Sequence, residues 1–262
     1  DNATLGGAVA CGLSGPRRPY AGAVRDFVLG CRIINGRGEV LHFGGEVMKN
    51  VAGYDVSRLM CGAMGTLGLL LDISIKVLPR PAMEITLAQE CTAAVALARM
   101  NAWAGRPLPL SAAMYDGEQL RFRLSGAASA VKAAHQYMGG DLVADAGRFW
   151  RDLGELRHGF FSDATSLWRL SLPPAAAPLA LPGKSLIDWG GAQRWLVSSA
   201  DEEFIRAAAA AAGGHATLFR GGPRDAERFH PLPAALLALH RSLKQAFDPA
   251  GIFNPGRLYA DL

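Results

Sequence analysis

Hydrophobic and polar positions in the first 80 residues follow the two-residue period of β-strands. Residues 26–34 are apolar enough for a strand, and an Asn-Gly-Arg-Gly turn then leads into a second extended stretch at 39–43. This pattern predicts a β-hairpin, because the turn residues tolerate positive φ angles. Aliphatic residues at every second position of 69–77 predict a further strand with one apolar face. Between the hairpin and this strand, residues 54–60 predict a short helix.

Beyond the prolines at positions 79 and 81, strands alternate with helices, which predicts an α+β fold class. Alanine-rich stretches mark several of the helices, the first of which has Thr92 as its N-cap. A proline- and alanine-rich stretch at 173–182 predicts a surface loop. The predicted strands are 83–89, 109–114, 119–124, 166–172, 193–198 and 215–220, and the predicted helices are 92–104, 127–138, 148–161, 202–212 and 232–247.

Composition excludes several classes of protein. The 262 residues carry a net charge of +4 that is spread along the chain, whereas nucleic-acid-binding proteins concentrate basic residues on one element. No apolar run reaches 18 residues, so the sequence predicts no membrane span. The four cysteines match no metal-ligand spacing and indicate reduced, buried thiols in a cytoplasmic protein. The chain starts without a methionine or a signal peptide, so we expect a further segment upstream.

Two glycine clusters are candidates for binding a phosphorylated ligand. In the first, at 3–10, Gly6 and Gly7 let backbone N–H groups approach an anion, and the hydroxyls of Thr4 and Ser14 add donors. The structural alternative is a short helix between two tight turns. The second cluster, at 62–68, either lines a ligand or forms a helix end and a strand entry. Neither cluster has the spacing of a Rossmann fingerprint or a P-loop.

The sequence contains no motif for nucleophilic catalysis, and we assign no catalytic residue and no metal ligand. Acidic residues at 201–203 stand at a predicted helix start, where capping explains them. Arg121, Arg123 and Arg169 lie on predicted strands, where they either bind a carboxylate or are exposed charges.

Six segments, taken in order, resemble the PCMH-type FAD-binding family, the flavin oxidases related to vanillyl-alcohol oxidase. The resemblance is strong over 1–80 and 244–259 and weak between them. Within the family, the Lys-Asn-Val-Ala-Gly-Tyr-Asp run is most similar to the FAD-binding E subunits of bacterial glycolate oxidases. The six segments are 4–7, 14–18, 24–30, 49–55, 65–68 and 251–256.

The resemblance implies an architecture and a set of FAD contacts. It implies the second half of an FAD-binding domain at 1–80, an α+β (ferredoxin-like) cap domain at 81–240, and a tail at 241–262 that returns to the FAD domain. Asn254 on this tail would approach the flavin ring. Gly6, Gly7, Ser14, Gly15 and Gly22 would lie near the pyrophosphate and flavin, and Gly65, Thr66, Gly68 and Leu69 near the adenosine.

The sequence departs from the family in two respects. The βα subdomain that normally opens the FAD domain is absent, so we expect this chain alone to be inactive, with an incomplete FAD site. The His-rich element of relatives that oxidise 2-hydroxy acids is also absent. The resemblance therefore implies that glycolate chemistry belongs to a D-type flavoprotein partner and that electrons leave through an iron–sulfur subunit. It places the complex in the cytoplasm, with contact to the inner face of the membrane through partners.

Two alternatives stay open at the level of the sequence. The protein is either a self-contained FAD-dependent oxidoreductase with its own substrate or an assembly subunit without flavin. A well-formed pocket with convergent polar groups would favour the first, and a large exposed apolar patch would favour the second.

Overall fold

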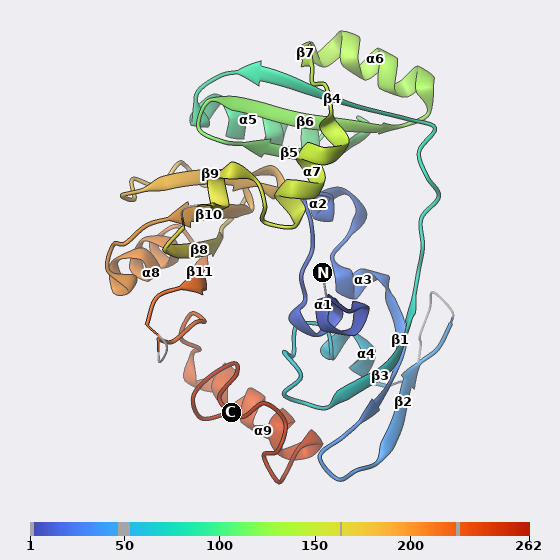
Figure 1. The fold of residues 1–262 in the computed structure, drawn as a ribbon, viewed down its shortest axis with the longest axis vertical. Coiled ribbons are helices and arrows are strands. Elements are labelled where there is room, and N and C mark those ends of the chain that lie inside the picture. Colours follow the sequence, from blue (N-terminus) through green and yellow to red (C-terminus); the bar gives the residue numbers. More distant parts are fainter. Residues whose placement is uncertain (1–2, 47–52, 163, 224–225) are drawn as a thin grey trace. The chain divides into compact units, whose positions relative to one another are not determined.

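The computed structural model describes residues 3–46, 53–162, 164–223 and 226–262, which form two compact units (Figure 1). The first unit contains the described residues of Asp1–Ser14, Gly22–Pro79 and Pro231–Leu262, and the second those of Gly15–Ala21 and Arg80–His230. Helices combined with antiparallel sheets confirm the predicted α+β class. The division into 1–80, 81–240 and 241–262 stays a prediction.

A three-stranded antiparallel sheet forms the centre of the first unit. Its strands are β1 (Val28–Ile34), β2 (Val40–Gly44) and β3 (Leu69–Ile75), in the order β2-β1-β3 (Figure 1). The predicted hairpin is confirmed, and the side-chain oxygen of Asn35 accepts two backbone N–H groups of its turn at 3.0 Å. Such local bonds fix the turn and hence the register of the hairpin.

A β-bulge interrupts the alternation that the sequence predicts for β3. Arg32 pairs with Asp72 whereas Ile33 pairs with Leu70, so the chain gains one residue at Leu71. Ile33 is buried in the core of the unit, whereas Leu69 and Leu71 are 54% and 42% exposed. The prediction of one continuous apolar face was therefore wrong for this strand, because a two-residue period cannot reveal an extra residue.

Helices of the first unit pack against its sheet and its core. α4 (Val56–Leu59) lies within the predicted helix at 54–60, and α9 (Ala234–Phe247) within that at 232–247. Leu243 and Phe247 of α9 pack against the buried cluster. The other helices described in this unit are α1 (Leu5–Cys11) and α3 (Val24–Phe27).

Cys31 is buried, but Cys11 at the end of α1 is exposed, so the expectation of uniformly buried thiols was wrong for Cys11.

Gly36, in the hairpin turn, lies against the end of α9. Its N–H donates to the carbonyl of Phe247 at 2.8 Å, and a Cβ at this position would lie 2.6 Å from Cα of Asp248. We expect Gly36→Ala to destabilise the protein by about 1–3 kcal/mol, as in other overpacked sites. Gly45→Ala is the matched control, because nothing lies within 4 Å of a Cβ there. Equal losses in thermal unfolding for the two variants would contradict this account of the turn.

An eight-stranded antiparallel sheet organises the second unit (Figure 1). Its strand order is β11-β8-β10-β9-β5-β6-β4-β7. The strands are β4 (Met83–Glu90), β5 (Leu110–Tyr115), β6 (Gln119–Gly126), β7 (Asp141–Leu142), β8 (Ser166–Ser171), β9 (Lys184–Asp188), β10 (Gln193–Val197) and β11 (His215–Gly221).

Helices pack on this sheet in separate buried clusters. α5 (Ala93–Ala104) and α6 (Ala128–Met138) contribute to one of them, and α8 (Glu202–Ala211) contributes to another. Trp150, on α7 (Ala146–Gly154), belongs to a third. α5, α6 and α8 agree with the predicted helices, and the oxygen of Thr92 accepts the N–H of Val95 as the predicted N-cap.

The second unit also corrects two predictions. The single helix at 148–161 is instead α7 followed by a 3₁₀ turn, η1 (Gly159–Phe161), because Leu156 adopts a φ of 56° and ends the α-helix. β9 was missed, because it follows the surface loop at 173–182 without a periodic pattern of its own. It leads into a second 3₁₀ turn, η2 (Trp189–Gly191).

Candidate functional site

The first glycine cluster forms the start of α1. The side-chain oxygen of Thr4 accepts the N–H of Gly7 at 3.0 Å, so this hydroxyl caps the helix. The N–H groups of Leu5 and Gly6 have no acceptor within the described residues, as is usual for the first turn of a helix. A Cβ at Gly6 would touch nothing within 4 Å. The short helix that the sequence offered as the alternative to a phosphate site is therefore present. Its first turn nevertheless leaves the N–H donors of Leu5 and Gly6 and the open space at Gly6 available to an anion.

The second glycine cluster is bonded to the end of α1. The N–H of Gly62 donates to the carbonyl of Val9 at 3.1 Å, and that of Met64 donates to Ala10 at 2.8 Å. Gly12 ends the helix with a φ of 64°, and a Cβ there would lie 3.0 Å from Cα of Gly62. The two candidate clusters are therefore neighbours through backbone contacts.

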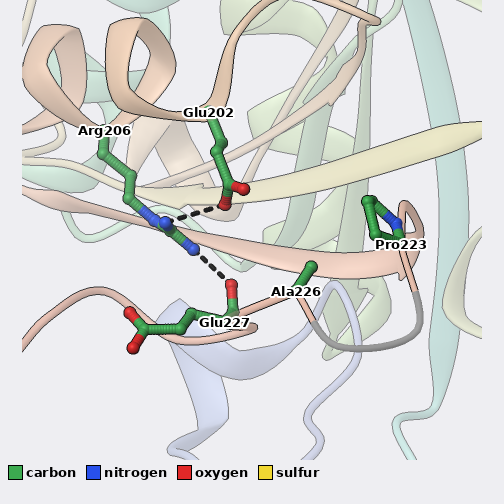
Figure 2. A pocket seen from close by; sticks show the side chains of 5 residues that line it. All are labelled: Glu202, Arg206, Pro223, Ala226 and Glu227. Atoms are coloured by element: carbon green, nitrogen blue, oxygen red, sulfur yellow. Dashed lines mark hydrogen bonds and ion pairs between the residues drawn. The ribbon is translucent and has the colours of Figure 1, made fainter.

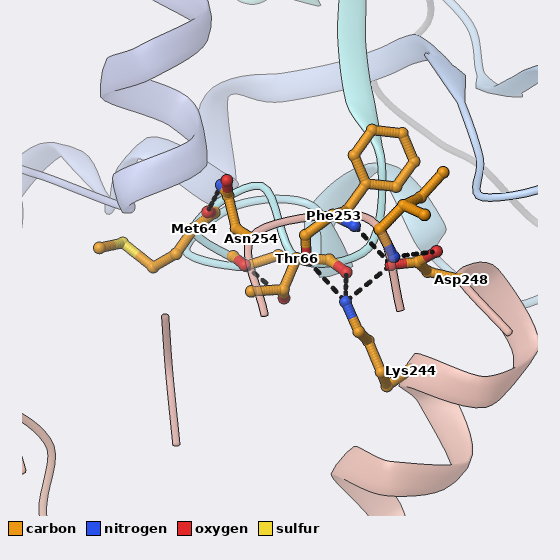
Figure 3. A network of polar contacts seen from close by, with 8 residues as sticks. Met64, Thr66, Lys244, Asp248, Phe253 and Asn254 are labelled. Carbon is orange, nitrogen blue, oxygen red and sulfur yellow. Dashed lines mark hydrogen bonds and ion pairs between the residues drawn. The ribbon is translucent and has the colours of Figure 1, made fainter. Parts of the chain in front are cut away.

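Asn254 joins the C-terminal tail to the second cluster. Its amide nitrogen donates to the carbonyl of Met64 at 2.8 Å (Figure 3). A Cβ at Gly65 would lie 2.8 Å from that nitrogen and would displace the amide, and the φ of 71° at Gly65 also favours glycine. Thr66 is buried, and its hydroxyl donates to Ala63 at 2.7 Å. The structure thus brings Gly65, Thr66 and Asn254 together.

A buried ion pair holds this tail in place (Figure 3). The ammonium group of Lys244 lies 2.8 Å from Oδ2 of Asp248 and donates to the carbonyls of Thr66 at 2.9 Å and Phe253 at 2.7 Å. Burial raises the pKa of Asp248, but Lys244 and the N–H groups of Phe253 and Ile252 outweigh it and hold the pKa below its usual value. Neither charged residue was predicted from the sequence, although their spacing of four at a helix end is a signal.

Four other predicted residues have contacts or backbone conformations of their own. The oxygen of Ser14 accepts the N–H of Val24 at 3.1 Å. Gly22 has a φ of 104°, which favours glycine, and Gly68 packs closely on the carbonyl of Ile34. Gly15 belongs to the second unit, where its carbonyl accepts the indole N–H of Trp189 at 3.1 Å.

Most of the Lys-Asn-Val-Ala-Gly-Tyr-Asp motif, namely 49–52, falls outside the described residues. Of its remaining part, Tyr54 is 96% exposed and Asp55 caps α4 by accepting the N–H of Arg58 at 3.1 Å. The exposed ring is available for contact, and the aspartate has a structural role.

An open cavity of about 420 Å³ lies in the second unit (Figure 2), and none of the predicted cofactor residues lines it. Arg206 points into it and lies 2.8 Å from Glu202. Its guanidinium also donates to the carbonyl of Glu227. Glu202 therefore neutralises the one arginine among the lining residues. Its lining residues are Glu202, Arg206, Pro223, Ala226 and Glu227.

The described part of the chain contains no group of three or more His, Cys, Asp or Glu side chains arranged to hold a metal ion. Within the same residues, no helix combines the length and the apolar character needed to cross a bilayer.

Comparisons with known proteins agree with the resemblance found in the sequence. The model of the C-terminal domain of FAD-linked oxidases matches residues 232–258, the segment that carries Lys244, Asp248 and Asn254. Glycolate oxidase subunit GlcE of Escherichia coli K12 is 53% identical over the whole chain, which covers 73% of that protein. Glycolate oxidase subunit GlcD of Bacillus subtilis 168 is 37% identical over 84 residues, or 32% of the chain and 18% of that protein.

A solved structure shares the fold. Alkyldihydroxyacetonephosphate synthase aligns over 97% of this chain and 57% of its own, with a TM-score of 0.63 and 15% identity. At that identity the match supports the architecture alone.

Proposed function

Since the chain belongs to the family of the glycolate oxidase subunit GlcE, an oxidoreductase subunit among the FAD-linked oxidases, we propose that it is the FAD-binding subunit of a glycolate oxidase complex. The observation that carries this proposal is the contact of the two glycine clusters with the tail. Through α1 and Asn254, segments that are far apart in the sequence meet in one place.

The residues of this place suit a dinucleotide. The N–H groups of Leu5 and Gly6, which have no acceptor within the described residues, are donors for a pyrophosphate, and the open space at Gly6 lets it approach. Gly65, Thr66, Gly68 and Leu69 would border the adenosine, and Asn254 would approach the flavin ring. FAD, when bound, supplies the two-electron chemistry, and the protein positions it and excludes water.

The finer parts of the proposal concern the complex. A D-type flavoprotein subunit would oxidise glycolate to glyoxylate, and an iron–sulfur subunit would carry the electrons onward. The described residues contain no recognisable catalytic constellation, which supports assigning the substrate chemistry to a partner. We place the complex in the cytoplasm, with contact to the membrane through its partners.

Substitution of Gly6 tests the proposed FAD site. For the full-length protein, including the upstream segment that the resemblance implies, we expect Gly6→Val to weaken FAD binding by about tenfold or more, because the side chain would occupy the space of the pyrophosphate. Nothing in the described protein lies within 4 Å of the new Cβ, so the thermal unfolding of the flavin-free protein should change little. FAD titration followed by flavin fluorescence measures the affinity.

Gly45→Val is the control for this test, because its surroundings are equally open. If Gly6→Val and Gly45→Val bound FAD with the affinity of the unaltered protein, the proposed place of the pyrophosphate would be wrong.

One observation favours the alternative of an assembly subunit. The first unit exposes several large apolar side chains, which a protein partner would cover. Tight binding to a partner by the flavin-free protein would support that role. The side chains are Leu5, Val40, Leu69, Val77, Leu78, Leu236, Leu239 and Ile252.

A further inference from the structure

A short segment of the chain, Gly15–Ala21, belongs to the second unit although the residues on both sides of it belong to the first. It contains α2 (Arg18–Ala21), which packs against β5 (Figure 1). Gly15 is one of the residues predicted to contact FAD, and Ser14 and Gly22, two others, flank the segment. Whatever holds this segment therefore bears on three predicted cofactor residues.

Trp189 contacts the segment at two points. Its indole N–H donates to the carbonyl of Gly15 at 3.1 Å, and the guanidinium carbon of Arg18 lies 4.4 Å from the centroid of its ring, a cation–π contact. The same carbonyl accepts the backbone N–H of Arg18 at 3.1 Å, so both of its lone pairs are used. Trp189 therefore fixes the start of the turn that leads into α2.

The backbone that presents this tryptophan is strained. In η2, Trp189, Gly190 and Gly191 follow one another at φ angles of 54°, 65° and 102°. Glycine adopts such angles freely, but a bulky residue does so only where its surroundings impose them, and strained residues cluster where a protein positions a ligand. A Cβ at Gly191 would lie 2.4 Å from the carbonyl oxygen of Pro174, so the turn is closely packed.

Two further contacts attach the segment to the same unit. Pro16 is buried, and its Cδ would lie 3.6 Å from a Cβ placed on Gly154 of α7. Tyr20 packs against the buried cluster that includes residues of α5 and β5. The second unit thus holds the segment along its length, at positions 15, 16, 18 and 20.

The residues at the two ends of the segment are constrained by it. The side-chain oxygen of Ser14 accepts the N–H of Val24 at 3.1 Å within the first unit. One planar peptide group joins Ser14 to Gly15, so the carbonyl that Trp189 holds limits where Ser14 can lie. The segment ends directly before Gly22, which is constrained in the same way.

We propose that Trp189 is a positioning residue for FAD and acts through Gly15 and the turn into α2. This inference rests on the proposed function and deepens it, because Trp189 lies outside all six segments that resemble FAD-binding proteins. A backbone that is held before the cofactor arrives does not have to be ordered when the cofactor binds, so the affinity is higher. Trp189 exerts this effect without any contact of its own with the cofactor.

Hydrogen exchange of the flavin-free, full-length protein tests the attachment. The N–H groups of residues 18, 20 and 21 donate to the carbonyls of Gly15 and Arg17, which should slow their exchange. Trp189→Phe keeps an aromatic face for Arg18 but removes the indole N–H, and we expect exchange there to quicken by about threefold. Trp189→Ala loses both contacts, and we expect an increase of about tenfold or more.

FAD titration of the same proteins, followed by flavin fluorescence, tests the consequence for the cofactor. We expect the affinity to fall by about threefold in Trp189→Phe and by about tenfold or more in Trp189→Ala. The visible circular dichroism of the bound flavin should also change in both variants, because it depends on the surroundings of the flavin ring. A loss of stability alone would leave that spectrum as it is.

Trp150→Phe is the matched control, because it also removes an indole hydrogen bond within the second unit, the one to Thr86 at 2.8 Å. Both the exchange of residues 18–21 and the FAD affinity should stay within about twofold there. Unchanged exchange in Trp189→Ala would overturn the inference. So would FAD affinities of both Trp189 variants equal to that of Trp150→Phe, and this result would leave the proposed function in place. An unaltered protein that binds no FAD would contradict the proposed function and this inference together.

Discussion

Replacing Lys244 with methionine is expected to lower the free energy of unfolding by about 3–5 kcal/mol. The Asp248 carboxylate is completely buried and the Lys244 side chain is 12% exposed, so the variant would leave an uncompensated charge in the core. It would also remove the donor that joins the carbonyls of Thr66 and Phe253. Chemical denaturation measures the loss, and we expect proteolysis to begin in the tail after α9, because this tail loses its attachment.

Arg241→Met is the control for this prediction. Arg241 lies on the same helix and forms an ion pair with Asp261, but both side chains are about half exposed. An exposed pair contributes at most about 1 kcal/mol, so the control should lose little. Similar losses in Arg241→Met and Lys244→Met would show that the buried pair does not hold the tail.

Asp248 also gives this contact a pH dependence. Because its pKa in the folded protein lies below the unfolded value of about 3.9, its stabilisation is complete above that pH and is lost as the pH falls further. The contact between tail and glycine cluster is therefore expected to persist at neutral pH.

The second large effect is the pH dependence of stability that Asp188 causes. Its direction is opposite to that of Asp248, because the pKa of Asp188 is raised. The carboxyl group is buried and has no ion pair with any of the residues that the structure describes, and it accepts the N–H of Trp189 at 2.7 Å and that of Gln193 at 3.4 Å. Burial raises its pKa to about 7, although these two donors act in the other direction. A folded pKa above the unfolded value of about 3.9 means that stability is greatest below pH 4 and falls as the pH rises towards 7.

We expect the free energy of unfolding to fall by about 2–4 kcal/mol over this interval in the unaltered protein, at about 1.4 kcal/mol for each unit of pKa shift. Asp188→Asn has no charge to bury, so its stability should vary much less with pH and should exceed that of the unaltered protein at pH values above about 7. Denaturation at a series of pH values measures both curves.

Asp116→Asn provides the contrast for this experiment. Burial raises the pKa of Asp116, but backbone N–H groups and Arg121 outweigh this effect, so its pKa lies below the ordinary value. Substitution of Asp116 should therefore leave the fall in the free energy of unfolding between pH 4 and 7 in place. Parallel curves for Asp188→Asn and the unaltered protein would contradict the assignment of this pH dependence to Asp188.

Periodicity predicted most of the elements but not their irregularities. The hairpin, the helix capped by Thr92 and the helix before the tail follow from residue pattern and turn chemistry alone. The bulge at Leu71 and the end of α7 at Leu156 do not, because both arise where tertiary packing imposes a backbone that the local sequence does not prefer.

The candidate site was accessible to sequence reasoning only in part. Glycine clusters and Asn254 stand out because their residue types are unusual, and the structure places Gly65 directly against Asn254. Lys244 and Asp248 look like an ordinary surface pair in the sequence, and only the fold shows that they are buried.

The visible absorption spectrum of the full-length protein, purified without added cofactor, tests the central claim most directly. We predict an oxidised-flavin spectrum at near-stoichiometric occupancy, which glycolate bleaches only when the D-type subunit is present. A colourless protein that remains colourless after incubation with FAD would contradict the proposed role as an FAD-binding subunit.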